Sequence, residues 1–206
     1  MAAPFRVGRS TPAPTQQSST TCGPACVTVA RMLANPAFAD WVRHGYPDDQ
    51  AQHTADDRFA ACEQVVVRRT NGLVGAGERL QPPWPRALGT PPWGARAELE
   101  HGVAVPGTRY ETQWFRLAGR ARLGNVHEEL RSRTHEVGPA LLYIGSTWLP
   151  RHIVLVLPGG GGPDPDLYEP STGRVVGLPR DRFVARRLRL AGWDVPWCAV
   201  WPAASR

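Results

Sequence analysis

The segment from Gln16 to Leu33, with the sequence QQSSTTCGPACVTVARML, constrains the fold of this chain more than any other segment. Its polar first part ends at Cys22, and apolar residues then recur at every third or fourth position, namely Cys26, Val29, Ala30 and Leu33. Residues three or four positions apart lie on the same face of a helix. The pattern therefore predicts a short helix that begins at Cys22 and buries one face.

The expected ends of this helix carry ordinary start and stop signals. Thr20 or Thr21 can cap its start, and Pro24 is tolerated in a first turn whose N–H groups lack helical partners anyway. The Asn35–Pro36 pair supplies the stop. Cys22 thus lies at a helix N-terminus, where unpaired N–H groups and the helix dipole favour a thiolate, which is the nucleophilic form.

Cys22 by itself leaves two interpretations open. A free cysteine is often simply a small buried residue, whereas a catalytic cysteine requires a histidine from another part of the chain. Gly23, beside it, would leave room for a substrate. The four cysteines, at positions 22, 26, 62 and 198, form no CxxC pair and no regular framework. We therefore expect no metal, no cofactor and no disulfide.

Motifs at both ends of the chain resemble those of a known peptidase family. Gln16 is followed after five residues by Cys22-Gly23-Pro24-Ala25, His152 opens the apolar run HIVLVL, and Glu169-Pro170 ends the next short strand. The chain thereby resembles the C39-like cysteine peptidases of the papain-like superfamily. These look like Q-x5-C-G-x-A before an apolar helix, with a downstream histidine at a strand start and an Asp-Pro after it.

The resemblance implies a role for each of these residues. Cys22 would be the nucleophile and His152 the base, while Gln16, with the backbone N–H of Cys22, would form the oxyanion hole. Gln17 could replace Gln16 if the register slips. Glu169 stands where the family has Asp, and would orient the imidazole. Since Glu is one methylene longer, either the strand pairing shifts or its side chain folds back. The other five histidines are expected at the surface.

The remaining patterns predict helices first and then strands, which is an α+β order. The resemblance implies the same arrangement, a papain-like fold with the N-terminal catalytic helix packed on an antiparallel β-sheet. We expect an extended arm over residues 1–15 and a single domain over residues 16–206. Helices are expected at 36–41, 56–69, 126–133 and 181–190, although Val65–Val67 would equally suit a strand, and Asn125 is the expected cap of the third. Strands are expected at 109–115, 139–144, 152–157, 167–169, 175–176 and 195–201.

Tryptophan is concentrated in two regions outside the motifs. Residues 72–94 form a long loop rich in Pro and Gly, and Trp84 or Trp93 in it would either pin the loop by packing or wall a substrate cleft. Near the C-terminus, Trp193, Trp197 and Trp201 alternate along a strand, which favours the core over a subunit contact. We assign Trp84 and Trp93 as candidate substrate-binding residues together with Gly23.

Length and charge exclude little. A chain of 206 residues can bury a hydrophobic core without disulfides or a structural metal. No segment suits a membrane span or a signal peptide, so we expect a cytoplasmic protein without a membrane partner. The net charge of +6 comes with 24 basic residues that are all arginine, a composition bias that says little about partners. The basic stretch 180–189 is interpreted as a solvated helix face, with a phosphate-binding patch as the alternative, so no nucleic-acid partner is expected.

The sequence therefore predicts a cysteine peptidase, or a related thiol acyl-transfer enzyme, that acts on a peptide or amide bond through a Cys-His-Glu triad and a thioacyl-enzyme. A buried tunnel with little water near Cys22 would favour transfer to an amine over hydrolysis. Two alternatives remain: a catalytically silent binding protein of the same fold, to which the Glu169 departure points, and nucleic-acid binding through residues 180–189. Neither the substrate nor the oligomeric state follows from the sequence.

Overall fold

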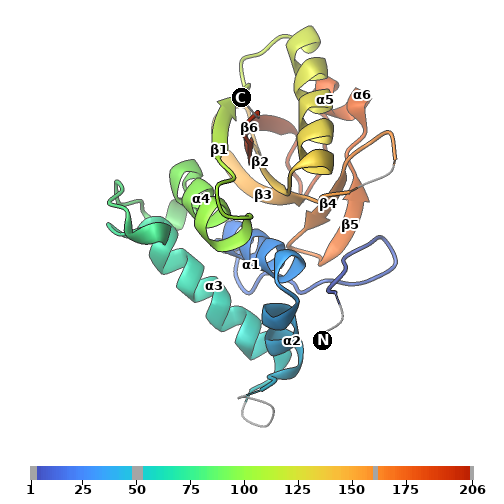
Figure 1. Cartoon of the computed structure of the whole chain (residues 1–206). Helices are drawn as coiled ribbons and strands as arrows, with labels where there is room; N and C mark the ends of the chain where they lie inside the picture. The colour runs from blue at the N-terminus through green and yellow to red at the C-terminus, as the bar shows by residue number, and fades with distance from the viewer. Residues whose placement is uncertain (1–3, 48–52, 160–161, 205–206) are drawn as a thin grey trace.

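The computed structural model describes residues 4–47, 53–159 and 162–204 (Figure 1). Four helices come first: α1 (Cys22–Ala34), α2 (Pro36–His44), α3 (Ala55–Asn71) and α4 (Pro92–Glu98). Short helical turns η1 (Ala76–Glu78), η2 (Arg86–Leu88) and η3 (Leu99–Val103) flank α4. The rest of the chain supplies β1 (Tyr110–Trp114), α5 (Arg120–Glu136), β2 (Ala140–Gly145), β3 (Pro150–Val156), β4 (Asp166–Glu169), β5 (Arg174–Gly177), α6 (Arg180–Ala185) and β6 (Val195–Pro202).

The six strands form one sheet in the order β1-β6-β2-β3-β4-β5, and every neighbouring pair is antiparallel. Strand β2 lies inside the sheet and all six of its residues are buried, as its continuously apolar sequence predicts. The expected α+β class, with the N-terminal helix packed on an antiparallel sheet, is confirmed.

Alternate residues of the central strands face two separate cores. In β2, Leu141 and Tyr143 join the core shared with α1, whereas Leu142 and Ile144 join the core that contains residues of α5 and α6. The sheet is accordingly covered on both faces, with α1–α4 on one side and α5 and α6 on the other (Figure 1). Burial on both faces explains why these strands lack polar alternation.

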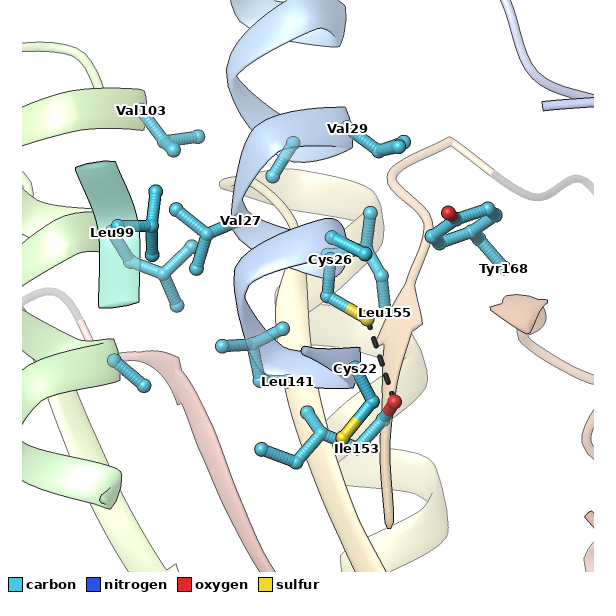
Figure 2. Packing of buried hydrophobic residues seen from close by; sticks show 14 of the residues in the cluster. Cys22, Cys26, Val27, Val29, Leu99, Val103, Leu141, Ile153, Leu155 and Tyr168 are labelled. Atoms are coloured by element: carbon cyan, nitrogen blue, oxygen red, sulfur yellow. Dashed lines mark hydrogen bonds between the residues drawn. The ribbon is translucent and has the colours of Figure 1, made fainter. Parts of the chain in front are cut away.

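Helix α1 is at the centre of the first core. Figure 2 shows Val27 pointing toward Leu99 and Cys26 toward Leu155 and Tyr168, so the helix is buried on more than one side. The Cys26 thiol donates a hydrogen bond to the carbonyl of Ile153 in β3, at 3.5 Å. This contact ties α1 to the strand that carries His152.

The N-terminal segment crosses the turn between β4 and β5. The N–H groups of Ala13 and Gln16 donate to the carbonyls of Gly173 and Pro170, at 2.9 and 2.8 Å. Arg9 pairs with Asp166 at 2.8 Å. Gln16 is thereby held next to the end of the strand that carries Glu169.

Several local expectations need correction. Helix α1 begins at Cys22, but the Thr21 hydroxyl donates to the Ser18 carbonyl and does not cap the helix. Helix α5 begins at Arg120 after Gly119, so Asn125 lies inside it and is not a cap. The open choice at residues 65–67 is resolved as helix, within α3. None of the helices in the described residues is long and apolar enough to cross a membrane.

The basic helix expected over 181–190 ends at Ala185 instead. Arg186, Arg189 and Ala191 have positive φ values of 55°, 54° and 46°, and a left-handed backbone cannot continue a right-handed helix. The Arg186 guanidinium donates to the carbonyls of Arg116 and Ala118. Part of the basic stretch therefore serves to hold two loops together.

Candidate active site

Three of the predicted site residues meet at the start of α1. Cys22 is the first residue of α1, His152 lies in β3, and Glu169 is the last residue of β4. The His152 Nε2 lies 2.7 Å from the Glu169 Oε1, and the Cys22 side chain is near enough to His152 to raise the pKa of the imidazole. Since Nε2 faces the carboxylate, Nδ1 is the nitrogen that remains for the thiol. All three side chains are buried.

Glu169 reaches His152 by folding back over the turn between β4 and β5. Its Oε1 also accepts the Ser171 N–H at 3.1 Å, and its Oε2 accepts the hydroxyls of Ser171 and Thr172 at 2.6 and 2.9 Å. The pairing of β3 with β4 covers only Leu155 with Tyr168 and Val156 with Leu167. The extra methylene is thus accommodated by the turn, and the carboxylate is held by four contacts in one position.

The three groups shift one another's charge states. Burial by itself would lower the pKa of His152, but hydrogen bonds to Cys22 and Glu169, and their negative charges, raise it to about 9. Burial would raise the pKa of Glu169, yet hydrogen bonds from His152 and Ser171 and the charge of His152 lower it to about 2. At neutral pH the site therefore holds an ionised carboxylate and a protonated imidazole, the partner that a thiolate needs.

Gln16 lines the same cleft as Cys22 and His152. One of its amide N–H groups donates to the Ser18 carbonyl at 2.8 Å, and in the described part of the chain the other has no partner. Gln17, the alternative, is exposed, and its side-chain amide donates to the Thr15 carbonyl. Of the two glutamines, Gln16 is the one that lines the cleft together with Cys22.

A buried carboxylate on α3 holds the loop that carries these glutamines. The backbone N–H of Gln17 donates to Glu63 at 3.2 Å, and the Thr21 side chain lies near the same carboxyl group. Burial raises the pKa of Glu63 to about 7, although the Gln17 N–H and the Thr21 side chain act in the opposite direction. Sequence reasoning missed this residue, because a single Glu in a helix has no local signal for burial.

Gly23 does not leave space for a substrate, contrary to the expectation. A Cβ atom built on it would lie 2.4 Å from the Thr90 hydroxyl oxygen and 3.0 Å from the Ile153 side chain. Gly23 is buried and is absent from the residues that line the cleft. Its missing side chain allows the loop at Thr90 to pack directly against the first turn of α1.

The cleft beside Cys22 has a volume of about 730 Å³. Trp84 and Trp93, from the long loop, both line it, as the sequence suggested. Trp193 and Trp197 are half-buried: each packs against a core cluster, in line with the expectation, and each also lines the cleft. Trp201 is fully buried in the core. Trp114, at the end of β1, was missed because it looked like an ordinary strand residue.

Other candidate groups do not form a second site of the same kind. His127, expected at the surface, is fully buried, and its Nε2 lies 2.8 Å from the Leu178 carbonyl oxygen. In residues 4–47, 53–159 and 162–204, no cluster of three His, Cys, Asp or Glu side chains could hold a metal ion. The four cysteines are free thiols.

Comparisons with known proteins add one distant likeness. No protein-family model and no curated protein matches the sequence. The crystal structure of the Pseudomonas avirulence protein AvrPphB superposes with a TM-score of 0.46 and 13% sequence identity, over 96% of this chain and 98% of that chain. At this level of similarity, conclusions about chemistry rest on the site geometry.

Proposed function

We propose that this chain is a papain-like cysteine peptidase, close to the C39-like group, that cleaves a peptide or amide bond through Cys22, His152 and Glu169. The observation that carries the proposal is the 2.7 Å contact between the His152 imidazole and the Glu169 carboxylate, in a cleft that His152 lines together with Cys22 at a helix N-terminus. The helix dipole and the imidazolium both stabilise the thiolate.

The first half of the reaction forms a thioacyl-enzyme. The Cys22 sulfur attacks the carbonyl carbon, a C–S bond forms, and the oxygen becomes an oxyanion that the Cys22 N–H and the Gln16 amide can stabilise. When the C–N bond breaks, the imidazolium of His152 gives its proton to the leaving amine. Glu169 keeps the ring in position throughout and stabilises its positive charge.

The second half returns the enzyme to its starting state. His152 takes a proton from water, the resulting hydroxide attacks the thioester carbon, and the C–S bond breaks to release a carboxylic acid. The lining of the cleft includes exposed residues such as Thr20, Leu88 and Ser171, so the cleft opens to solvent. This access favours hydrolysis over transfer to an amine.

A direct test is the turnover of a p-nitrophenyl ester, which requires acyl transfer but little recognition. We expect a burst of nitrophenol, an acyl adduct on Cys22 in the intact mass, and then slow turnover. Cys22→Ala should abolish the adduct, and His152→Ala should abolish turnover. If all three proteins release nitrophenol at the same rate, the proposal is wrong. The alternative, a catalytically silent binding protein, was suggested by Glu in place of Asp at position 169. The contact of Glu169 with His152 weakens that argument.

A further inference from the structure

The cleft is lined by an unusual number of aromatic side chains. Five tryptophans and one tyrosine contribute to it: Trp84, Trp93, Trp114, Tyr143, Trp193 and Trp197. Among the described residues, no Asp or Glu lines the cleft. Arg151, which is exposed, is the one lining residue among them that always carries a charge. The chemistry of the walls is therefore apolar and aromatic, with a positive charge at the rim.

Several of these aromatic rings are held in place by the protein itself. Trp84 and Trp93 meet edge to face with centroids 5.1 Å apart, and the Trp93 indole N–H donates to the Pro82 carbonyl. The Trp197 indole N–H donates to the Ser146 carbonyl at 2.8 Å, and the Arg116 guanidinium lies 4.7 Å above its ring. Rings fixed in this way lose little conformational entropy when a ligand binds.

The mouth of the cleft exposes apolar surface to water. Leu88, Trp114 and Leu149 line the cleft and are 54%, 55% and 47% exposed. A cluster of exposed apolar side chains around a polar centre is typical of a ligand-binding surface. An apolar group of the ligand would cover these side chains.

Polar atoms near the cleft point to the backbone of that ligand. The Gln16 Oε1 and the Trp84 Nε1 are buried, and neither has a hydrogen-bond partner in the described residues. Both residues line the cleft. A peptide supplies both an N–H donor for the Gln16 oxygen and a carbonyl acceptor for the Trp84 N–H, whereas a hydrocarbon chain would supply neither.

From these observations we infer that the cleft selects an extended peptide with a large aromatic or aliphatic side chain beside the bond presented to Cys22, and an acidic residue directed toward Arg151. The cleavage part of this statement rests on the proposed function; the binding part does not.

The test measures binding to the Cys22→Ala protein by titration calorimetry, so that no turnover is needed. Three blocked pentapeptides are compared: one with a central Phe and a flanking Glu, one with Gly in place of Phe, and one with Lys in place of Glu. We expect the Phe peptide to bind about 10- to 100-fold more tightly than the Gly peptide, from the area of an aromatic side chain. The Glu peptide should bind a few-fold more tightly than the Lys peptide.

Matched variants locate the effect. Trp114→Ala, added to Cys22→Ala, should remove most of the preference for Phe. Trp148→Ala is the control, because Trp148 is 81% exposed and lies outside the cleft lining. Arg151→Gln should abolish the difference between the Glu and Lys peptides.

Three results would overturn the inference: equal binding of the Phe and Gly peptides, an equal loss in the Trp114→Ala and Trp148→Ala proteins, or tighter binding of dodecanoate than of any peptide. The rate of Cys22 alkylation in the wild type shows whether a failure concerns the ligand class or the proposed enzyme activity. A reactive Cys22 without a Phe preference overturns the ligand class alone. An inert Cys22 with a Phe preference overturns the enzyme and supports a peptide-binding protein.

Discussion

Replacing Glu169 by Gln should move the pH dependence of activity without dismantling the site. The amide oxygen of Gln can still accept from His152, but the negative charge is lost. A hydrogen bond to a charged group contributes about 1.5–3 kcal/mol, and one pKa unit corresponds to about 1.4 kcal/mol. The pKa of His152, about 9 in the wild type, should therefore fall by about one to two units.

The consequence is visible above neutral pH. A protonated His152 is needed to give a proton to the leaving group, and its loss begins at lower pH in the variant. Hydrolysis of an amide substrate at pH 8.5 should fall about tenfold more than hydrolysis at pH 6. The assay is kcat against pH for the wild type, Glu169→Gln and Glu169→Asp. A variant whose descending limb coincides with that of the wild type would refute the reasoning.

Three further predictions concern Gln16, Gly23 and Glu98. Gln16→Ala should lower kcat for ester turnover about 100-fold, yet leave iodoacetamide alkylation of Cys22 unchanged because that reaction forms no oxyanion; an equal loss in both assays would contradict the assigned role. Gly23→Ala should cost about 1–3 kcal/mol in urea unfolding, since its Cβ meets Thr90, and an unchanged midpoint would show that the loop yields. Burial raises the pKa of Glu98 to about 7. Between about pH 4.5 and 7 the folded state therefore keeps a proton on Glu98 that the unfolded state releases. As the pH rises through this range, the free energy of unfolding should fall by up to about 1.4 kcal/mol per pH unit. Because Glu63, with a pKa also raised to about 7, contributes in the same direction, Glu98→Gln should reduce this dependence in thermal unfolding without abolishing it, and the exposed Glu136→Gln should leave it unchanged. Identical curves for all three proteins would contradict the prediction.

The sequence predicted the regular elements where local pattern and tertiary packing agree. Helix α1 occupies Cys22–Ala34 because its apolar spacing, its Pro in the first turn and the following Asn35 all indicate the same boundaries. Strand β2 is apolar throughout, and it is buried on both faces. The helix predicted over 181–190 was wrong beyond Ala185, because nothing in the composition of that stretch indicates the left-handed backbone at Arg186 and Arg189.

Prediction of the site divides in the same way. The choice of Cys22, His152 and Glu169 followed from the resemblance of their motifs to those of the C39-like peptidases. The fold places His152 2.7 Å from Glu169 and in the same cleft lining as Cys22. The walls of the cleft could not be predicted, since Trp114, Trp193 and Trp197 come from segments far apart in the chain and reach it only through strand order. Gly23 was misjudged because a glycine beside a nucleophile can admit either a substrate or a neighbouring loop. Here the neighbour is Thr90.

The central claim is that Cys22 and His152 form a thiolate–imidazolium pair. The most direct test is the rate of Cys22 alkylation by iodoacetamide from pH 4 to pH 9, followed by peptide mass mapping, in the wild type and in His152→Ala. The account predicts rapid alkylation of the wild type well below pH 8, where free thiols with a pKa of about 8.5 react slowly, and loss of this reactivity in His152→Ala. If Cys22 reacts like a free thiol in both proteins, no ion pair exists and the proposed enzyme mechanism is contradicted.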